Sequence, residues 1–521
     1  MTSTDTLPAE VDTIVVGGGT AGCVIAGRLA EGTSDSILLI EAGPDYGPAE
    51  SGRWPEDLMD ATSLAMWSHD WGYVGEYAGQ TVHFNRARVM GGCSSHNAGA
   101  VVYGSRLDYD AWAAAGNPGW STDDLLPLFA LGWKQLRVRV VGLDELTPFQ
   151  SACMDAMVAN GIPAVDDFND LDETVGVAPF PVNLNGGLRI NSAFAYVDPV
   201  RDRENMTVLG DVLVDRLLIR DGRVEGLVVQ HGGSEHTVRA ARIVLSAGAY
   251  GTPGIMLRSG IGPADELAEV GVSSEHDLPG VGRNLHDQPS LEIDYAGSDE
   301  LIDVMERHLE GGWRPDEQAI GKLPSSLCVE GGFDLHIYPI GGRQWLDKSK
   351  WRWTIGAACL TPRSRGSIRL SGSRPEDKPI IDHRYLSDPE GYDLARLAEA
   401  VERAREVAAV PELRRLIGEE IKPGPSVVDL ASIKDFLKHS AIHYYHPCGS
   451  CKMGPASDPA AVVDSEGQVH GIEGLYVGDA SIMPDVMSGN TNMPVTVIGE
   501  RIARGLLLGS GAAPGERATV N

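Results

Sequence analysis

The sequence predicts an α/β (α+β) protein with two domains. Near the N-terminus, an apolar run at 13–16 enters a glycine-rich turn, and an Ala-rich helical pattern leaves it. Between 206 and 248, short apolar runs separated by turn residues indicate further strands. After about residue 290 the pattern changes to short strands followed by long helical stretches. These observations favour a Rossmann-type domain and a second domain built on an antiparallel sheet plus helices.

The first turn reads G-x-G-x-x-G through Gly17, Gly19 and Gly22. Gly17 permits the turn, Gly19 lets a pyrophosphate approach the backbone, and Gly22 lets the helix pack close to the strand. A second apolar run, 37–40, ends in Glu41, 19 residues after Gly22. An acid at this place holds the ribose hydroxyls of an adenine dinucleotide. The pattern therefore predicts a dinucleotide site, and it leaves NAD and FAD equally open.

The composition is that of a large globular protein. With 521 residues, 42% of them hydrophobic, the chain can bury more than one core. A net charge of −30 excludes nucleic acid and anionic membrane surfaces as partners. Because no uninterrupted apolar run of membrane-spanning length occurs and 1–12 is polar and acidic, we expect a cytoplasmic protein. Seven cysteines, an odd number, fit reduced thiols better than a disulfide framework.

Several local patterns predict further helices, strands and turns. Large rings gather at Trp67, Trp71 and Tyr73, where they either pack in a core or line a substrate cavity. Asp221-Gly222 separates two apolar runs and predicts a hairpin. Further predictions are a helix at 147–160, strands at 353–360 and 367–370, helices at 393–407 and 432–439, and an unpacked polar tail at 510–521.

Cys448 and Cys451 form a C-x-x-C pair, which suggests a redox dithiol or half of a metal site. No second Cys or His pair has zinc spacing. We therefore interpret the pair as incidental and predict no metal site.

From about residue 11 to 508 the chain resembles the glucose–methanol–choline (GMC) family of flavin oxidoreductases, and within it the choline oxidase-like members. The resemblance rests on separate motifs in order: the first glycine-rich turn, 88–95, 248–262, 278–285, 446–454 and 478–484. It implies FAD as the cofactor. It also implies a discontinuous FAD-binding domain (8–50, 80–150, 186–290 and 462–509) and a substrate-binding domain (51–79, 151–185 and 291–461).

The resemblance extends to individual cofactor residues. The loop Val89 to Asn97 matches the flavin-attachment loop of choline oxidase-like members, in which the histidine at the position of His96 is bonded to the flavin 8α-methyl group. It therefore implies a covalent histidyl-FAD at His96. Besides Gly17, Gly19, Gly22 and Glu41, the cofactor-binding residues that it implies are Arg88, Gly91, Gly92, Ser95, His96, Asn97, Val214, Asp479, Asn492 and Met493.

The resemblance also implies which residues are catalytic. His446 matches the family's catalytic histidine, and Asn490, 44 residues later, matches a position that carries asparagine or histidine in other members. We expect His446 to act as the base and alkoxide stabiliser, because an imidazole titrates near neutral pH. We expect Asn490 to orient the substrate oxygen.

The substrate prediction is coarser. Trp54 and Tyr445 match two members of an aromatic box for a trimethylammonium group. The glutamate that partners this cation has no clear counterpart, and Glu330 is a poor substitute. We therefore expect a neutral primary or secondary alcohol, such as a sugar, a glycoside or an aryl alcohol. Tyr444 stands where choline oxidase-like members carry valine and could obstruct oxygen.

Several alternatives stay open at this point. O2 as acceptor, giving H2O2, is favoured slightly over a flavin dehydrogenase with a quinone or another acceptor. Choline oxidation itself and a non-redox hydroxynitrile lyase-like member are further possibilities. A nicotinamide dehydrogenase is the alternative that the first motif alone allows. A homodimer is suggested by analogy with the family alone.

Overall fold

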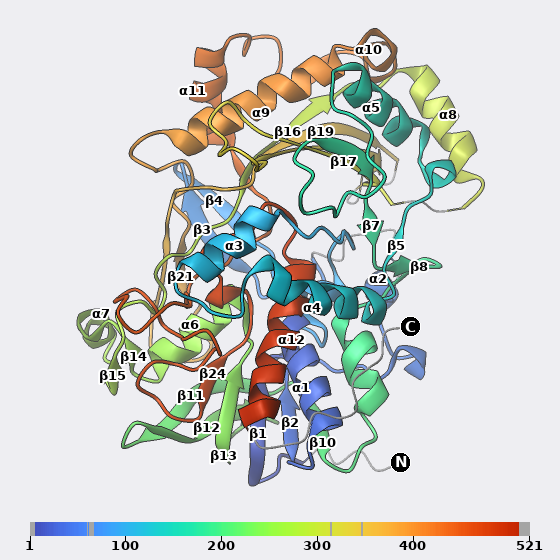
Figure 1. Ribbon diagram of the computed structural model, residues 1–521. Helices are drawn as coiled ribbons and strands as arrows, with labels where there is room; N and C mark the ends of the chain where they lie inside the picture. The colour runs from blue at the N-terminus through green and yellow to red at the C-terminus, as the bar shows by residue number, and fades with distance from the viewer. Residues whose placement is uncertain are drawn as a thin grey trace.

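The computed structural model describes residues 6–59, 61, 67–312, 315–344, 347 and 349–509. The predicted tail at 510–521 lies outside this part of the chain. Two bodies are visible in Figure 1, one around a mostly parallel sheet and one around an antiparallel sheet. The mixed α/β class predicted from the sequence is confirmed.

The first sheet has the strand order β10-β2-β1-β13-β12-β11, with β24 pairing with the second half of β13. Its strands are β1 (Glu10–Val16), β2 (Ile37–Ile40), β10 (Met206–Leu209), β11 (Leu213–Arg220), β12 (Arg223–His231), β13 (Ser234–Leu245) and β24 (Leu475–Val477). Strands β10, β2, β1, β13 and β24 run parallel, whereas β11, β12 and β13 pair antiparallel. The predicted hairpin is present, with Asp221 and Gly222 at φ 51° and 73°.

Parallel strands bring their carboxyl ends to one edge of a sheet. Here β1 is followed by Gly17, β2 by Glu41, β13 by Ser246 and β24 by Gly478-Asp479. Helices α1 (Thr20–Gly32), α6 (Gly248–Arg258) and α12 (Asn492–Gly509) accompany this sheet, and α1 packs against α12. Ligand-binding loops are therefore gathered at this edge.

The second sheet is antiparallel, with the order β22-β16-β19-β18-β17-β6 and β23 pairing with β16. Its strands are β6 (Gly176–Pro179), β16 (Pro289–Tyr295), β17 (Ala319–Leu323), β18 (Leu335–Arg343), β19 (Trp351–Cys359), β22 (Glu420–Lys422) and β23 (Ile442–His443). One face packs under α5 (Pro148–Ala159), α8 (Asp299–Leu309), α9 (Tyr392–Ala408), α10 (Pro411–Ile417) and α11 (Leu430–Ser440), as Figure 1 shows. Because successive side chains of a strand point to opposite faces of the sheet, the other side chains of β16, β18 and β19 point toward the first body.

The remaining elements are a small sheet and separate helices and strands around the two bodies. A small sheet joins β3 (Tyr73–Tyr77), β4 (Gln80–Phe84), β20 (Ser367–Arg369) and β21 (Ile380–Asp382). Shorter elements are α2 (Glu56–Met59), α3 (Arg106–Ala114), α4 (Thr122–Gln135), α7 (Ala264–Glu269), β5 (Arg139–Val140), β7 (Pro181–Val182), β8 (Leu184–Asn185), β9 (Leu188–Arg189), β14 (Ile261–Gly262) and β15 (His276–Asp277). Among the described helices, none combines the length and apolar character that crossing a bilayer needs.

The predicted domain limits divide the chain differently from its cores at two places. The limit between 79 and 80 separates β3 from β4, which pair with each other in one hairpin. Trp54 and Leu58, from the segment 51–79, pack in the core of the first body rather than the second. Limits carried over from a resemblance do not show such contacts, because strand pairing and packing between segments appear only in the folded chain.

Candidate functional site

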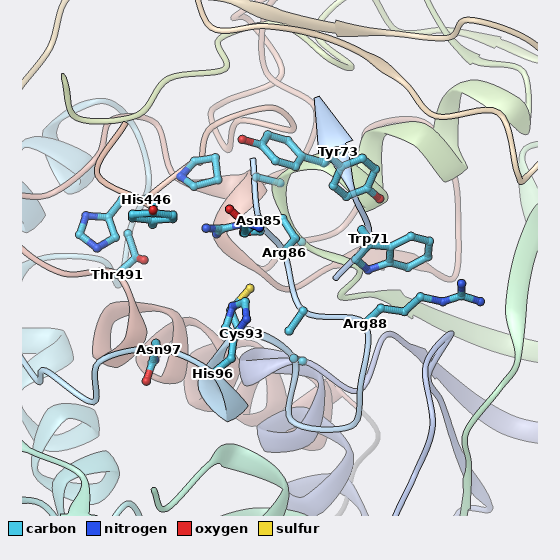
Figure 2. A pocket seen from close by; sticks show the side chains of 18 of the residues that line it. Trp71, Tyr73, Asn85, Arg86, Arg88, Cys93, His96, Asn97, His446 and Thr491 are labelled. Atoms are coloured by element: carbon cyan, nitrogen blue, oxygen red, sulfur yellow. The ribbon is translucent and has the colours of Figure 1, made fainter. Parts of the chain in front are cut away.

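A cavity of about 1150 Å³ extends from the carboxyl edge of the first sheet to strands β16, β18 and β19 of the second. The predicted site residues that line it are Gly17, Gly19, Glu41, Arg88, Gly92, His96, Asn97, Val214, Tyr444, Tyr445, His446, Asp479, Asn490 and Asn492. Trp67, Trp71 and Tyr73 also line it, while Tyr73 at the same time belongs to a buried cluster against which Trp71 packs, so these rings take part in both a core and a cavity wall. Figure 2 shows His446 and Thr491 at one end of the view and Trp71 with Arg88 at the other.

Four predicted cofactor residues support the cavity from behind. The Gly91 amide donates to the Gly18 carbonyl at 2.6 Å, and the Ser95 hydroxyl donates to the Met90 carbonyl at 2.9 Å. Gly22 lies inside helix α1, and Met493 is buried near Gly132 of α4. None of these four residues lines the cavity, and the hydrogen bonds of Gly91 and Ser95 hold the second glycine-rich loop in place.

Trp54 is not part of the cavity lining. Its ring is 8% exposed and lies edge-on to Phe194 at 4.8 Å between centroids, and its Nε1 donates to the Gly47 carbonyl at 2.8 Å. Both the apolar faces and the polar atom of this indole are occupied by protein. The prediction that Trp54 contacts substrate is therefore wrong for this structure, and the ring belongs to the core of the first body.

The three glycines of the first turn differ in what surrounds them. Gly17 has φ +98°, and a Cβ there would lie 2.5 Å from the Ser246 carbonyl oxygen. A Cβ on Gly22 would lie 1.9 Å from the Gly17 carbonyl oxygen. A Cβ on Gly19 would meet nothing closer than 3.9 Å, because this residue faces the cavity at the N-terminus of α1. This geometry suits an anion approaching the amides of α1.

Glu41 borders the same turn. Its two carboxylate oxygens accept from the amides of Gly18 and Gly43, both at 2.9 Å. Burial raises the pKa of Glu41 to about 7, although these amides oppose the shift. The Val212 amide donates to the Glu41 carbonyl at 2.9 Å, which brings the start of β11, with Val214, beside the acid.

His96 directly follows the 3-10 turn Gly92–Ser95. The side chain is 5% exposed, and its Nδ1 has no hydrogen-bond partner among the described residues. Burial, together with the charges of Arg86 and Arg189, lowers the pKa of His96 to about 3. The ring is therefore neutral at physiological pH and keeps a lone pair free. In Figure 2 it lies beside Cys93, between the two ends of the cavity.

Asp479 connects three segments at the sheet edge. One carboxylate oxygen accepts from the Gly248 amide at 2.8 Å and the Thr252 hydroxyl at 2.6 Å, and the other accepts from the Ser481 amide at 2.8 Å. Burial raises the pKa of Asp479. The carboxylate thus fixes the loops after β13 and β24 around the cavity.

The residues present fit FAD. The cavity is continuous from the Gly17–Gly19 turn to His446 and Asn490. Three buried polar atoms of its lining, His96 Nδ1, Asn490 Oδ1 and Asn492 Nδ2, have no partner in the described part of the chain. Unpaired buried polar atoms cost free energy unless a ligand or water satisfies them. Gly19, Glu41 and Val214 would hold the adenosine diphosphate half, and His96 and Asn492 the flavin half.

The ring of His446 is held by Gln288. The Gln288 Nε2 group donates to the carbonyls of Leu360 at 3.0 Å and Met487 at 2.9 Å, so its Oε1 atom is the one that faces His446 Nδ1, at 2.6 Å. An amide oxygen only accepts, so Nδ1 carries the proton and Nε2 keeps the lone pair. This tautomer follows from the hydrogen-bond network rather than from observed hydrogens.

His446 is also kept neutral. The side chain is 7% exposed, and burial with the charge of Arg86 lowers the pKa of His446 to about 3. An imidazole with the ordinary pKa of 6.5 would be only about a quarter neutral at pH 6. Lowering this pKa leaves nearly all of His446 neutral there, with a lone pair on Nε2.

Asn490 completes this end of the cavity. Its Nδ2 lies 3.5 Å from His446 Nε2. Because Nε2 is an acceptor, a donor group of Asn490 must face it, which supports this amide orientation. An alcohol hydroxyl between the two atoms could donate to Nε2 and accept from Nδ2. The two groups thus converge on one point, where an oxygen could be deprotonated and stabilised.

Aromatic side chains surround this point. The Tyr444 ring lies 4.8 Å from the His446 ring and 5.0 Å from Tyr338, between centroids. Tyr445 has φ +64° and packs edge-on against His443 at 4.2 Å. A left-handed backbone at a non-glycine residue costs of order 1–3 kcal/mol and is typical of functional sites.

Four residues of the site were missed by sequence reasoning: Arg86 and Glu317, which line the cavity, and Asp287 and Gln288, which hold His446. Asp287 accepts from the His446 amide at 2.9 Å, and burial raises the pKa of Asp287 to about 6. The signal for Asp287 and Gln288 was their place directly after the 278–285 motif. Their distance in sequence from His446 hid the contact.

The cavity wall opposite the first sheet is acidic. Glu292, Asp294, Asp316 and Glu317 line it, and Arg352 pairs with Glu292 at 2.5 Å. Burial raises the pKa of Glu317 to about 7. Glu330, by contrast, is exposed and outside the cavity lining. This wall disfavours anionic substrates.

The seven cysteines are all free. Cys448 and Cys451 are buried, with the Cys448 Sγ 3.5 Å from His286 Nε2 and the Cys451 Sγ 3.8 Å from Met256 Sδ. Burial raises the pKa of both thiols well above the ordinary value. Neither sulfur is set up as a reactive thiolate.

Comparison with known proteins agrees with this geometry. Two family models described as GMC oxidoreductase match the chain, an N-terminal one at residues 11–290 and a C-terminal one at 362–499. Choline oxidase from Arthrobacter globiformis is 33% identical, over 95% of this chain and 94% of that protein. Human mitochondrial choline dehydrogenase is 32% identical, over 95% and 89%. The crystal structure of pyridoxine 4-oxidase from Mesorbium loti superposes with a TM-score of 0.84 at 30% identity, covering 95% of this chain and 98% of that one.

Proposed function

The chain belongs to the GMC oxidoreductase family, and from this premise we propose that it oxidises a primary or secondary alcohol with His446 as base and Asn490 as orienting group. It is an FAD-dependent alcohol oxidoreductase. The observation that carries the proposed roles is the fixed tautomer of His446, which leaves its Nε2 lone pair 3.5 Å from the Asn490 amide nitrogen.

In the proposed mechanism, the substrate hydroxyl donates to His446 Nε2 and accepts from Asn490 Nδ2. As the alcohol is oxidised, the hydroxyl proton moves to Nε2, and Asn490 holds the oxygen while it carries negative charge. FAD, when bound, supplies the acceptor for the hydride that leaves the α-carbon. Gln288 keeps the Nδ1 proton of His446 in place throughout, so that the ring cannot present N–H to the substrate.

The substrate that we propose is a neutral alcohol with an apolar or aromatic body. Tyr338, Tyr444 and Tyr445 give the wall beside His446 an aromatic surface. Trp54 lies in the core and Glu330 outside the cavity, so neither residue can complete a trimethylammonium box. Alcohols that carry a cationic nitrogen, such as choline, are the second candidate, because Glu317 and Glu292 make the wall acidic.

A substrate panel tests this proposal. Purified enzyme is mixed anaerobically with benzyl alcohol, a pyridylmethanol, a sugar and choline, and bleaching of the flavin absorbance is followed. The neutral aryl alcohol should reduce the flavin with the highest kcat/KM. If choline is the best substrate, the neutral class is wrong. If no alcohol bleaches the flavin while a cyanohydrin is cleaved, the protein is a lyase rather than an oxidoreductase.

The electron acceptor that we propose is O2, which gives H2O2. Tyr444 packs beside His446, where it could narrow the space for oxygen, so the alternative is a dehydrogenase with a quinone-like acceptor. Peroxide release under air, compared with turnover on an artificial acceptor, distinguishes them. Aerobic turnover at least equal to that with the artificial acceptor supports an oxidase. A cytoplasmic location and a homodimer also stay predictions, which cell fractionation and light scattering test.

We expect the flavin to be bonded to His96. The ring is buried and neutral, and its Nδ1 has no protein partner in the described region, so a lone pair is available for a bond to carbon. After acid precipitation, the yellow colour should stay with the wild-type pellet and pass into the supernatant for His96→Ala. Complete release of flavin from the wild type would contradict the covalent bond.

We expect Gln288→Leu to slow flavin reduction by alcohol by roughly 10–100-fold, by analogy with the loss of the group that orients a metal-bound histidine. The loss arises because Nδ1 of His446 no longer has an acceptor, so the other tautomer becomes accessible. Stopped-flow reduction rates measure the effect. The matched control is Gln344→Leu at the far side of the cavity, whose amide donates to the Trp351 carbonyl. Equal rates for wild type and Gln288→Leu would show that this hydrogen bond is dispensable.

A further inference from the structure

Arg86 lines the cavity between the loop of His96 and the end that holds His446. It follows β4 by two residues, and its backbone amide donates to Asp70 Oδ1 at 2.8 Å. Its Nε donates to the carbonyl of the preceding residue, Asn85. Within the described residues, no carboxylate lies within 4.0 Å of its guanidinium. Arg86 therefore brings a positive charge to the cavity without an ion-pair partner.

The other arginines of the lining are engaged or lie elsewhere. Arg258 donates to the carbonyls of Val214 and Asp215 at the dinucleotide end. Arg343 and Arg352, at the second sheet, pair with Glu306 and Glu292. Arg88 lies over the Trp71 ring at 5.0 Å, and its Nε donates to the Ala42 carbonyl. Arg88 likewise has no carboxylate partner among the described ion pairs, but it lies at the other end of the view in Figure 2 from His446, so Arg86 is set apart by its position.

The charge of Arg86 affects the pKa values of both histidines of the site. It contributes to the lowered pKa of His96 and of His446. In turn, three groups act to raise the pKa of Arg86. They are Asp287 and Tyr445, which flank His446, and Cys93, which precedes His96 by three residues. An arginine that interacts with both loops lies beside the space between them, where the flavin half of FAD fits.

We propose that Arg86 stabilises the negative charge that the flavin ring gains when it receives hydride. This inference rests on the proposed function, in which the alcohol loses a hydride from carbon and a proton from oxygen. The proton is held on His446 Nε2, so the aldehyde or ketone leaves neutral and one negative charge stays on the flavin. A guanidinium positioned beforehand beside such a charge stabilises it at little cost in reorganisation. The same cation makes His446 a weaker base, so its two effects have opposite signs.

Sulfite tests the electrostatic effect without turnover, because it adds to oxidised flavin and leaves a negative charge on the ring. In Arg86→Met the dissociation constant for sulfite should rise about tenfold or more. Arg86→Lys, which keeps the charge, should restore most of the affinity. The surface variant Arg403→Met, which loses an ion pair with Glu406, controls for a change in overall charge.

The pH profile supplies a second readout. Without the guanidinium, the acid limb of kcat/KM for Arg86→Met should move to higher pH, because His446 then binds a proton more readily. A residue with only a structural role would not weaken sulfite binding and move this limb together. If Arg86→Met and Arg86→Gln both keep sulfite affinity within twofold of wild type, the inference is wrong. Sulfite binding needs no alcohol, so this result is independent of whether an alcohol substrate is found.

Discussion

His446→Ala is expected to reduce flavin reduction by alcohol about 10²–10⁴-fold, the usual contribution of a positioned base. The variant removes the Nε2 lone pair that faces Asn490, so the hydroxyl proton has no acceptor at this point. FAD binding should be retained, because His446 lies at the opposite end of the cavity from the Gly17–Gly19 turn. Anaerobic stopped-flow reduction, with flavin content measured on the same sample, gives both quantities.

The control for this experiment is His443→Ala. This neighbour is also buried, but its Nε2 interacts with the His83 carbonyl at 3.0 Å and it packs against Phe84. If His443→Ala slows reduction as much as His446→Ala, the loss reflects packing rather than base catalysis. An unchanged rate in His446→Ala would remove the assignment altogether.

The second large effect separates two glycines only three residues apart. Gly19→Val should leave the protein folded but deprive it of FAD, because its side chain would enter open cavity space with nothing within 3.9 Å of its Cβ. Gly22→Val should unfold or strongly destabilise it, because its Cβ would lie 1.9 Å from the Gly17 carbonyl. Overpacking a tight contact costs typically 1–3 kcal/mol, and more where only backbone can yield.

The measurements for this pair are flavin content and urea unfolding of the apoprotein. For Gly19→Val, the unfolding midpoint should equal that of wild-type apoprotein, with little bound flavin. For Gly22→Val, the midpoint should fall or folded protein should be lost. If Gly19→Val binds FAD as wild type does, the pyrophosphate does not approach this residue.

The glycine turn, the hairpin and the two sheets could be predicted because their signals are local. Gly17, Gly19 and Gly22 lie within six residues, and Asp221-Gly222 forms one turn between adjacent strands. The spacing of glycines within a short segment indicates which backbone conformations that segment adopts. The α/β first body and the antiparallel second body followed from such patterns.

The parts that could not be predicted depend on contacts between distant segments. Gln288 and His446 are 158 residues apart, and only the folded chain shows that one sets the tautomer of the other. Trp54 matched an aromatic box by position, yet Phe194 and Gly47 draw it into a core. Arg86 stands two residues before the predicted cofactor residue Arg88, but its missing counter-charge is a property of the assembled cavity.

The order in which the first sheet is completed has a consequence for biosynthesis. Strand β13 pairs with β1 and also with β24. Helix α1 packs against α12, the helix that begins at Asn492. At about 5–20 residues per second, the ribosome adds α12 on the order of 25–95 s after β1. Until then, the glycine turn lacks the segment that carries Asn490 and Asn492. The nascent chain therefore cannot form the complete cavity lining before this segment is made, and complete enclosure of a ligand there has to wait for it.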